Sequence, residues 1–411
     1  MTRGLQDASG RARRSGDKAN ETGAREPGSP NVDEVAADPA AYFSAEQEKA
    51  KQRLGHANIL ISGQTGVGKS TLINAVFRVP LAEEGTGKPV TKNVQRYDVA
   101  GVPVTIYDTP GIELGHAKKD VIRDYTKTIA DSRKGGPDIV LHVAWYCIDA
   151  GQTRVQDYDA EIVRALAAEV PVILVLTQCI DDQRADALEE AIVAEKLPIE
   201  GSPVRTLARE RRVAGHTIPQ RGLEELVERT NDILPEAVRR AFINAQGVVI
   251  RLKANQARAV VGASSVAAAG IGAVPIPVPD AAVLMPVQLG MLASINAIFG
   301  MDMGSDRAVN LIRGLVGQGG VTVVGRQIAA NLLKVIPGVS VINASVAAAL
   351  TAALGEAYIQ LCSEMLRRGA AGTPMPDADM LPFLLDAYRN AFKKRRPKKN
   401  QTTASRAAGS A

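Results

Sequence analysis

The string GQTGVGKST, residues 63–71, constrains the fold of this chain more than any other feature. It fits the phosphate-binding pattern G-x-x-x-x-G-K-[ST], the Walker A pattern, at every required position. An apolar run, NILIS, comes directly before it, and a helical run, TLINAVF, follows. A glycine-rich turn that arose by chance would need neither the apolar run before it nor the helical run after it. The pattern therefore predicts a loop between a strand and a helix that wraps around a phosphate group.

Each residue type in this string has a physical reason. Glycine at 63, 66 and 68 lets the backbone approach a phosphate closely, with amide N–H groups and the helix N-terminus facing the anion. Lys69 is expected to reach the β- and γ-phosphates and to be catalytic, and the Ser70 hydroxyl to bind Mg²⁺. We expect every residue of the loop to contact the nucleotide: Gly63, Gln64, Thr65, Gly66, Val67, Gly68, Lys69, Ser70 and Thr71.

A second motif, YDTPG, ends an apolar run some forty residues later, at residues 107–111. A D-x-x-G string alone is common, but this one closes a predicted strand at the right distance from a phosphate loop. We assign Asp108 to the Mg²⁺ site, through water, and the Gly111 N–H to the γ-phosphate. Together the two motifs favour GTP over ATP as the nucleotide.

The segment between the motifs, EEGTGKPVTKNVQRY, carries Thr86 and Thr91, and either can close over the γ-phosphate and Mg²⁺. We favour Thr91, as metal ligand and catalytic residue, because it stands just before a predicted strand at Val94. The alternative is that both threonines only cap turns. A loop that the γ-phosphate orders and hydrolysis releases is the expected switch.

Between residues 57 and 234, short β-like runs alternate with charged helical stretches, which is typical of an α/β domain with a mostly parallel sheet. The predicted strands are 58–62, 94–99, 103–107, 138–145, 172–177 and 204–207. The predicted helices are 40–55, 69–77, 117–132, 154–168, 184–195 and 223–234. His142 and Trp145 lie on the fourth predicted strand, and we expect both in the core.

The 411 residues divide by composition into four parts. Residues 1–39 are polar, which predicts a disordered tail; residues 40–234 form the predicted nucleotide-binding domain. Residues 235–392 form a predicted all-α domain rich in Ala and Gly, and residues 393–411 a basic, low-complexity tail. Three widely spaced cysteines and an N-terminus without an apolar leader predict a cytoplasmic location.

At this point the chain resembles the Era-like branch of the Ras-like P-loop GTPases. The resemblance rests on GQTGVGKST, the threonine-bearing loop, YDTPGIE, HVAWYCID and LTQCID, over about 180 residues. It implies a six-stranded, mostly parallel sheet with one antiparallel strand. It also implies binding of GTP and GDP with Mg²⁺, and hydrolysis of GTP to GDP.

The base-specificity motif departs from the family pattern. Related GTPases carry N/T-K-x-D, whose Asp accepts hydrogen bonds from guanine. Here Thr177 fits, Gln178 replaces the Lys, and Ile180 stands where the Asp is expected. A one-residue bulge would bring Asp181 to the base, so we assign Thr177, Gln178 and Asp181 to the nucleotide, with Asp182 as the alternative. The later TLAR string, residues 206–209, matches the second base-contacting motif poorly.

A second departure concerns hydrolysis. Ras has a water-orienting glutamine directly after D-x-x-G, whereas this chain has the apolar Ile112. Hydrolysis must then use another group, such as Glu113 or His116, a backbone group, or an activating protein in trans. We therefore expect slow intrinsic turnover. Gly66 replaces the Asn of potassium-activated relatives, so we do not expect stimulation by potassium.

The second half contains three runs without Asp, Glu, Lys or Arg, at residues 259–279, 281–301 and 335–355. Each is long enough to cross a bilayer as a helix. However, the first contains three prolines, and all are rich in small residues, which pack closely in water or in lipid. This half resembles a helical domain of unknown function found with Era-like GTPases. A compact soluble bundle that touches a membrane is favoured, and inserted helices stay the alternative.

The basic run KKRRPKK, residues 393–399, fits several partners. It would attract an anionic membrane surface, hold RNA without sequence preference, or only keep the tail soluble. We favour a nucleotide-driven switch whose helical domain is attached at the cytoplasmic face of a membrane. An RNA or ribosome-assembly GTPase is the alternative, less favoured because no KH-type or RNP motif follows. A P-loop ATPase, or a nucleotide-binding module with weak base specificity, is the third.

Overall fold

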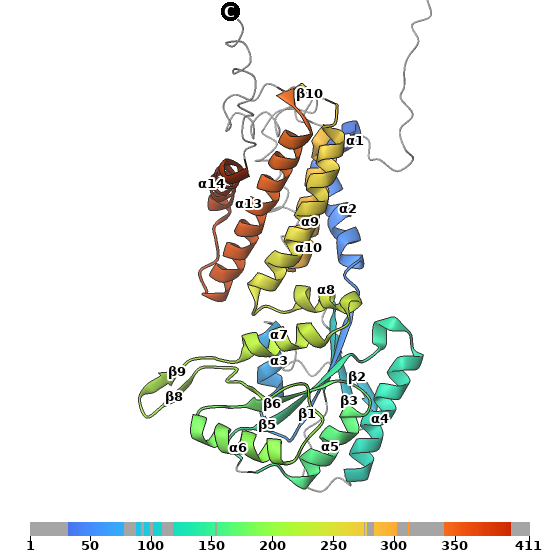
Figure 1. Ribbon diagram of the computed structural model, residues 1–411, viewed down its shortest axis with the longest axis vertical. Helices are drawn as coiled ribbons and strands as arrows, with labels where there is room; N and C mark the ends of the chain where they lie inside the picture. The colour runs from blue at the N-terminus through green and yellow to red at the C-terminus, as the bar shows by residue number, and fades with distance from the viewer. Residues whose placement is uncertain are drawn as a thin grey trace, which may run out of the picture.

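The computed structural model of the protein describes residues 32–77, 88–91, 94–98, 102–108, 118–152, 154–274, 276–277, 283–301, 311 and 341–395. An α/β part occupies one end of the molecule, and a bundle of long helices stands on it (Figure 1). The helix α8, Glu236–Ala245, lies between the two parts and contacts both the sheet and the long helices.

The α/β part is built on a seven-stranded sheet with the order β2-β3-β4-β1-β5-β6-β7. The strands are β1 (Ala57–Gly63), β2 (Lys88–Thr91), β3 (Val94–Asp98), β4 (Val104–Asp108), β5 (Val143–Asp149), β6 (Val172–Thr177) and β7 (Val204–Arg205). Strands β4, β1, β5, β6 and β7 are parallel, whereas β3 is antiparallel to β4 and β2 to β3. Strands β1 and β6 are buried at every position, as expected of a parallel sheet covered on both faces.

Helices cover both faces of this sheet. They are α3 (Lys69–Phe77), α4 (Lys118–Lys134), α5 (Asp157–Ala167), α6 (Asp182–Ala194) and α7 (Leu223–Ile233). Helices α3 and α7, together with α8, share one apolar core with the sheet, and α4, α5 and α6 share the other. Between β7 and α7, the antiparallel hairpin of β8 (Arg211–Val213) and β9 (His216–Ile218) projects from the α/β part (Figure 1).

The predicted fold class is confirmed. The expected six-stranded, mostly parallel sheet is present, and β2 adds a short strand at its edge. The main difference is β5, which begins five residues later than the predicted 138–145, because Pro137–Ile139 form a 3₁₀ turn after Gly136. The strand then continues to Asp149, opposite Thr177 of β6. The shift places Asp149 at the carboxyl edge of the sheet.

The helical part consists of long helices that pack through small residues. They are α9 (Ile250–Ile271), α10 (Met285–Phe299), α13 (Ala344–Ala370) and α14 (Asp377–Arg395). At Gly355 of α13, an added Cβ would lie 2.5 Å from the side chain of Val261 on α9, so these helices approach too closely there for a side chain. Short strands β10 (Ile276–Pro277) and β11 (Val341–Ile342) pair at the end of the bundle away from the sheet (Figure 1).

Two helices precede the sheet in sequence but pack on the long helices: α1 (Val32–Ala37) and α2 (Pro39–Gln52). Phe43 of α2 is buried in the same core as α10 and α13. Gln47 Nε2 donates a 3.3 Å hydrogen bond to the carbonyl oxygen of Met301, just after α10. The composition of the sequence predicts that residues from 40 onwards belong to the nucleotide-binding domain, whereas the apolar side of α2 packs in the helical part. The domain boundaries as a whole stay a prediction.

One helix in the described part of the chain, α13, is long and apolar enough to cross a membrane. Within its most apolar window, 61% of the residues are buried inside the protein. Because the core helix of a soluble protein has the same properties, this is weak evidence for insertion. The charge-free run 335–355 lies partly outside the described residues, and both interpretations of the helical part stay predictions.

Candidate functional site

The phosphate loop joins β1 to α3 at the carboxyl edge of the sheet. Gly63, Gly66 and Gly68 have φ angles of 141°, 81° and 98°, in the region that favours glycine. At Gly63 space also excludes a side chain, because an added Cβ would lie 2.3 Å from the carbonyl oxygen of Cys147 on β5. Backbone conformation therefore favours glycine at all three positions that the motif predicted, and close approach also requires it at Gly63.

Lys69 is the first residue of α3, and its side chain folds back over the loop. Its Nζ donates hydrogen bonds to the carbonyl oxygens of Gly63 (2.9 Å) and Gln64 (3.1 Å), and the residue is 7% exposed. Burial lowers the pKa of the Lys69 ammonium, while the nearby Asp108 carboxylate acts to raise it. A buried ammonium in a loop of glycines is well placed to bind an anion such as a phosphate.

The predicted metal ligands are only partly described. Ser70 is exposed in the first turn of α3, and Asp108 ends β4, whose backbone lies beside β1 with Asp108 opposite Ile61. A hydroxyl and a carboxylate are oxygen ligands that suit Mg²⁺. Thr91 ends β2, but its side chain lies outside the described residues, as do Gly111, Thr86 and most of the two switch segments, 83–93 and 111–119.

No group of three or more His, Cys, Asp and Glu side chains in the described ranges is arranged to hold a metal ion. Mg²⁺ commonly takes one or two protein ligands and completes its shell with water and phosphate oxygens. The chemistry of Ser70 and Asp108 therefore fits a metal that arrives with a nucleotide, not one held by the protein alone.

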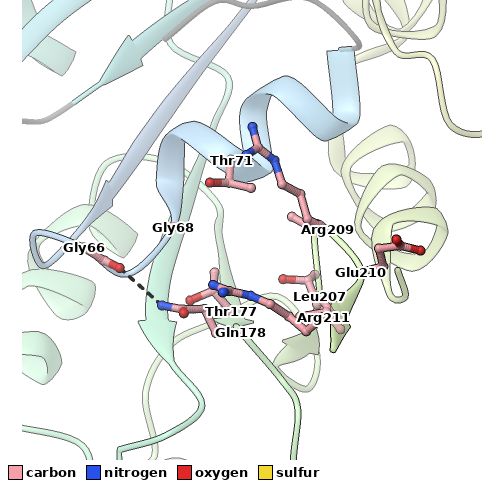
Figure 2. A pocket seen from close by; sticks show the side chains of 11 residues that line it. Gly66, Gly68, Thr71, Thr177, Gln178, Leu207, Arg209, Glu210 and Arg211 are labelled. Atoms are coloured by element: carbon pink, nitrogen blue, oxygen red, sulfur yellow. Dashed lines mark hydrogen bonds between the residues drawn. The ribbon is translucent and has the colours of Figure 1, made fainter. Parts of the chain in front are cut away.

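A pocket of about 290 Å³ adjoins the phosphate loop (Figure 2). It lies between this loop, the end of β6 and the segment that follows β7. Its lining residues are Gly66, Gly68, Thr71, Thr177, Gln178, Thr206, Leu207, Ala208, Arg209, Glu210 and Arg211. The pocket thus brings together the phosphate loop and two of the three residues predicted to contact the base.

Gln178 links these elements. Its Nε2 donates hydrogen bonds to the carbonyl oxygen of Gly66 (3.2 Å) and to Oδ2 of Asp149 (3.0 Å). The backbone of Gln178 has a φ of 55°, which turns the chain sharply after β6. Thr177 is buried, and its hydroxyl donates to the carbonyl oxygen of Ile148 (3.2 Å). Gln178 therefore connects the segment after β6 to the phosphate loop. It occupies the position at which the family motif has a lysine.

The structure does not bring Asp181 to this pocket. Asp181 is the N-cap of α6, and its Oδ1 accepts hydrogen bonds from the backbone N–H groups of Gln183 (3.0 Å) and Arg184 (3.3 Å). The chain turns into α6 directly after Ile180, so the carboxylate satisfies free amides of the first helical turn. The alternative, Asp182, pairs with Arg221 at 2.7 Å.

Two arginines that the sequence reasoning left unassigned extend over the pocket. Figure 2 shows Arg209 reaching toward Thr71 and Arg211 reaching toward Thr177, while Glu210 points away. Neither arginine makes an ion pair or a side-chain hydrogen bond with the residues that the structure describes. The signal in the sequence is the positive charge at the end of the TLAR string and two residues beyond it, at Arg209 and Arg211.

A buried carboxylate supports the loop from the other side. Asp159 of α5 is 1% exposed; it accepts hydrogen bonds from Tyr146 Oη (2.7 Å) and Gln64 Nε2 (3.3 Å). Burial raises the pKa of the Asp159 carboxyl, and these two hydrogen bonds act in the opposite direction. Gln64, the second residue of the loop, is thereby tied to α5.

Trp145 lies in the core, whereas His142 is half-buried and precedes the first residue of β5. His142 Nδ1 accepts a 3.1 Å hydrogen bond from the backbone N–H of Asn58, and burial lowers the pKa of this imidazole. Trp145 is fully buried, and its Nε1 donates to Thr230 Oγ1 at 3.1 Å. Neither side chain lines the pocket.

Comparison with known proteins matches two segments of the chain to family models. Residues 58–178 match the family described as "50S ribosome-binding GTPase". Residues 239–380 match a "Domain of unknown function (DUF697)". The chain therefore carries a P-loop GTPase domain followed by a DUF697 helical domain. This confirms the predicted combination of domains, and the Era-like branch in particular stays a prediction.

Curated relatives are similar to about a fifth to a third of this chain. The chain is 37% identical over 114 residues to "Translocase of chloroplast 108, chloroplastic" of Physcomitrium patens, which is 26% of this chain and 11% of that protein. It is 37% identical over 92 residues to a small ribosomal subunit biogenesis GTPase of Staphylococcus carnosus, which is 20% of this chain and 31% of that one. For Septin-9 of Rattus norvegicus the identity is 26% over 157 residues, 32% of this chain and 28% of the relative.

Among solved structures, a probable GTP-binding protein engB aligns with 43% of this chain and 98% of its own. The TM-score is 0.31 and the identity 18%, too low to support a conclusion. The chain spans about a tenth of the length of the chloroplast relatives, 11% for the first of them. Their activities as whole proteins therefore do not carry over to it.

Proposed function

We propose that this protein binds GTP and GDP with Mg²⁺, hydrolyses GTP to GDP, and uses the nucleotide state to act on its helical domain. The observation that carries the proposal is Lys69: its buried ammonium lies over a loop that requires glycine, beside Asp108. The match of residues 58–178 to a GTPase family supports the choice of nucleotide.

Each residue has a role in this proposal. Lys69 and the loop amides bind the β- and γ-phosphates, which spreads the charge that develops during phosphoryl transfer. Ser70 and Asp108 would hold Mg²⁺, which neutralises charge on the phosphate oxygens, and Thr91 would complete the site from the first switch segment. Ile112 cannot orient the attacking water, so the proposal includes slow intrinsic turnover and an activating protein in trans.

Base recognition uses Thr177 and Gln178, with Arg209 and Arg211 closing over the nucleotide. Because the Asp181 carboxylate caps α6 and does not line the pocket, the proposal gives it no contact with the base. This specific observation favours a second candidate for this site, a nucleotide-binding module that discriminates weakly between guanine and other bases. Guanine specificity and weak specificity make different predictions for binding of ATP.

A continuous set of contacts leads from the loop to the helical domain. Phe77 ends α3, and its ring lies 6.2 Å from that of Phe242 on α8 in an edge-to-face arrangement. Lys253 of α9 is buried, and its Nζ donates to the carbonyl oxygens of Asn244 on α8 and of Phe299 (3.2 Å) at the end of α10. We propose that this joint transmits the nucleotide state to α9 and α10.

The location follows as a further part of the proposal: a cytoplasmic protein attached to the inner face of a membrane. Exposed apolar side chains on and just after α9 support it, since Val266 and Val274 are each 74% exposed. The alternative of a ribosome-assembly GTPase draws on the family description and the Staphylococcus relative. Cell fractionation with nuclease separates the two, because nuclease would release a ribosome-bound protein and leave a membrane-bound protein in the pellet.

Isothermal titration of the full chain with GTP, GDP and ATP, with and without Mg²⁺, tests the nucleotide proposal. We expect Lys69→Ala to abolish Mg²⁺-dependent binding and Ser70→Ala to weaken it, while exposed Lys127→Ala on α4 leaves it unchanged. Unchanged GTP affinity in Lys69→Ala protein would refute the proposal. Equal affinity for GTP and ATP would establish the second candidate.

A further inference from the structure

A second pocket, of about 900 Å³, lies in the helical domain between α9, α13 and α14. Arg258 of α9 and Lys393, Lys394 and Arg395 at the end of α14 line it, and Glu356 of α13 is its one acidic lining residue. We call it the basic pocket. Three of the positive charges belong to the start of the basic run 393–399, and the fold brings the fourth, Arg258 of α9, beside them.

The one carboxylate holds two of the four cations. Arg258 Nη2 and Nε donate to Oε1 and Oε2 of Glu356, both at 3.2 Å, and Arg395 Nη2 lies 3.7 Å from Oε2. Glu356 is mostly covered, with a side-chain exposure of 16%, whereas that of Arg258 is 50%. The pocket thus holds two guanidinium groups in fixed positions around one carboxylate, with two lysines beside them and a net charge of four minus one, or three positive charges.

The position of the basic pocket in the bundle is also informative. Arg258 is the last charged residue of α9, and Glu356 is the first of α13. Beyond them, toward the end of the bundle away from the sheet, α9 and α13 carry no charge at residues 259–271 and 344–355. Gly262 on the pocket rim has nothing near its Cβ position, so the pocket opens to solvent beside this charge-free surface.

We propose that the basic pocket binds a phosphate group, supplied by the headgroup of an anionic phospholipid or by a soluble phosphate compound, and that Glu356 is its built-in competitor. An incoming phosphate would take the place of the Glu356 carboxylate on Arg258 and Arg395, since guanidinium binds both in the same two-pronged geometry. The two lysine ammonium groups would add positive charge without requiring a particular orientation of the phosphate. This deepens the proposed membrane attachment and does not depend on nucleotide binding.

The test is binding of the full GDP-loaded chain to phosphatidylcholine vesicles with and without phosphatidylglycerol. The Lys393→Gln/Lys394→Gln variant should bind the anionic vesicles roughly fivefold more weakly for each lysine removed. Glu356→Gln should bind them more tightly, by about fivefold, because it frees two arginines. Lys127→Gln/Lys134→Gln, an equal change of charge at exposed lysines of α4, should bind as the unchanged chain does.

These variants separate a site from general charge attraction. If the α4 double variant loses as much affinity as the pocket double variant, net charge governs binding and the proposal is wrong. If Glu356→Gln binds neither the anionic vesicles nor inorganic phosphate more tightly than the unchanged chain, Glu356 does not compete and the proposal is also wrong. Circular dichroism of each variant is compared first, so that a variant whose helical domain does not fold is excluded. Nucleotide affinity is measured as a second control, because it should be the same in every pocket variant.

A soluble ligand is distinguished by titration with inorganic phosphate. The titration uses a Lys69→Ala background, so that the phosphate loop contributes no heat. Heat that disappears in Lys393→Gln/Lys394→Gln, with equal recovery on neutral and anionic vesicles, would assign the pocket to a soluble phosphate compound. Binding of Lys69→Ala protein to anionic vesicles would show that the basic pocket acts without nucleotide. If this protein binds neither anionic vesicles nor inorganic phosphate, the proposal for the basic pocket is wrong, and the nucleotide proposal is unaffected.

Discussion

Gln178 donates a 3.2 Å hydrogen bond from its side-chain amide to the carbonyl oxygen of Gly66, which ties the segment after β6 to the phosphate loop. The same amide also donates to Asp149 at 3.0 Å. The segment that we propose to contact the base is therefore mechanically connected to the phosphate loop. A change at residue 178 should alter the loop itself and not only the contact with the base.

The first prediction follows from this bond. In Gln178→Asn protein, the amide is shorter by one methylene group and does not reach Gly66, while Asn tolerates the positive φ of 55°. We expect GTP and GDP affinities to fall together by about three- to tenfold, the value of one neutral hydrogen bond. Titration calorimetry measures the effect, with Gln183→Asn on α6 as the control. A loss for GTP alone would show that Gln178 does not act through the shared loop.

The arginines over the pocket give a second prediction. Arg209→Gln and Arg211→Gln should each weaken GDP and GTP binding by about tenfold, because charge-assisted hydrogen bonds to phosphate are stronger than neutral ones. Arg212 is exposed on the same hairpin and does not line the pocket, so Arg212→Gln is the matched control. If the Arg209 and Arg211 variants bind nucleotide as tightly as the Arg212 variant does, these two side chains are only exposed to solvent and do not contact the nucleotide.

A third prediction separates the two functions considered for Asp181. As an N-cap, Asp181→Ala should destabilise α6 by about 1 kcal/mol, and Asp181→Asn should change stability little because Asn caps equally well. Thermal unfolding measures both. If instead the carboxylate read guanine, Asp181→Asn would shift preference toward xanthosine triphosphate. We expect no such shift, and observing one would restore the assignment made from the sequence.

How far the sequence specifies this site depends on what each residue interacts with. The glycines and Lys69 were predictable, because a phosphate imposes the same local geometry wherever it is bound. Asp181 was not, because a carboxylate after a strand serves a base or a helix end, and only the three-dimensional path of the chain decides between them. The packing of α2 on α10 was also out of reach, since apolar periodicity shows that a helix has a buried face but not against what it packs.

The buried Asp159 gives a prediction about pH. Burial raises the pKa of this carboxyl above 3.8, its value in the unfolded chain. Between the two pKa values the folded protein binds more protons than the unfolded chain, so this group lowers the free energy of unfolding as pH rises through that window. Asp159→Asn removes the titration. Its stability relative to the unchanged protein should therefore improve from pH about 4 to pH about 7.

Urea unfolding at the two pH values measures this difference, and Asp157→Asn, at an exposed position of the same helix, is the control. A stability difference between Asp159→Asn and the unchanged protein that is the same at both pH values would mean that Asp159 keeps an ordinary pKa. A difference that moves in the opposite direction would mean that its hydrogen bonds to Tyr146 and Gln64 outweigh burial.

The last prediction concerns the joint between the two domains. Phe77 packs against both Trp145 of β5 (6.1 Å, stacked) and Phe242 of α8 (6.2 Å), so a shift of α3 on nucleotide binding moves the contact on which α8 rests. A ligand changes a distant element only as far as it binds two conformations differently, typically by about 1–3 kcal/mol. We expect amide hydrogen exchange in α10 to differ between protein loaded with GDP and with a nonhydrolysable GTP analogue.

In Phe77→Leu protein that difference should shrink, because the edge-to-face contact with Phe242 is lost while most of the apolar volume remains. Phe392→Leu is the matched control: Phe392 is equally buried, but it packs beside Tyr388 within the helical domain. Loss of the nucleotide-dependent difference in both variants would point to general loosening of the core. Equal exchange with both nucleotides in the unchanged protein would mean that the helical domain is a static module, and that the nucleotide acts only through the switch segments.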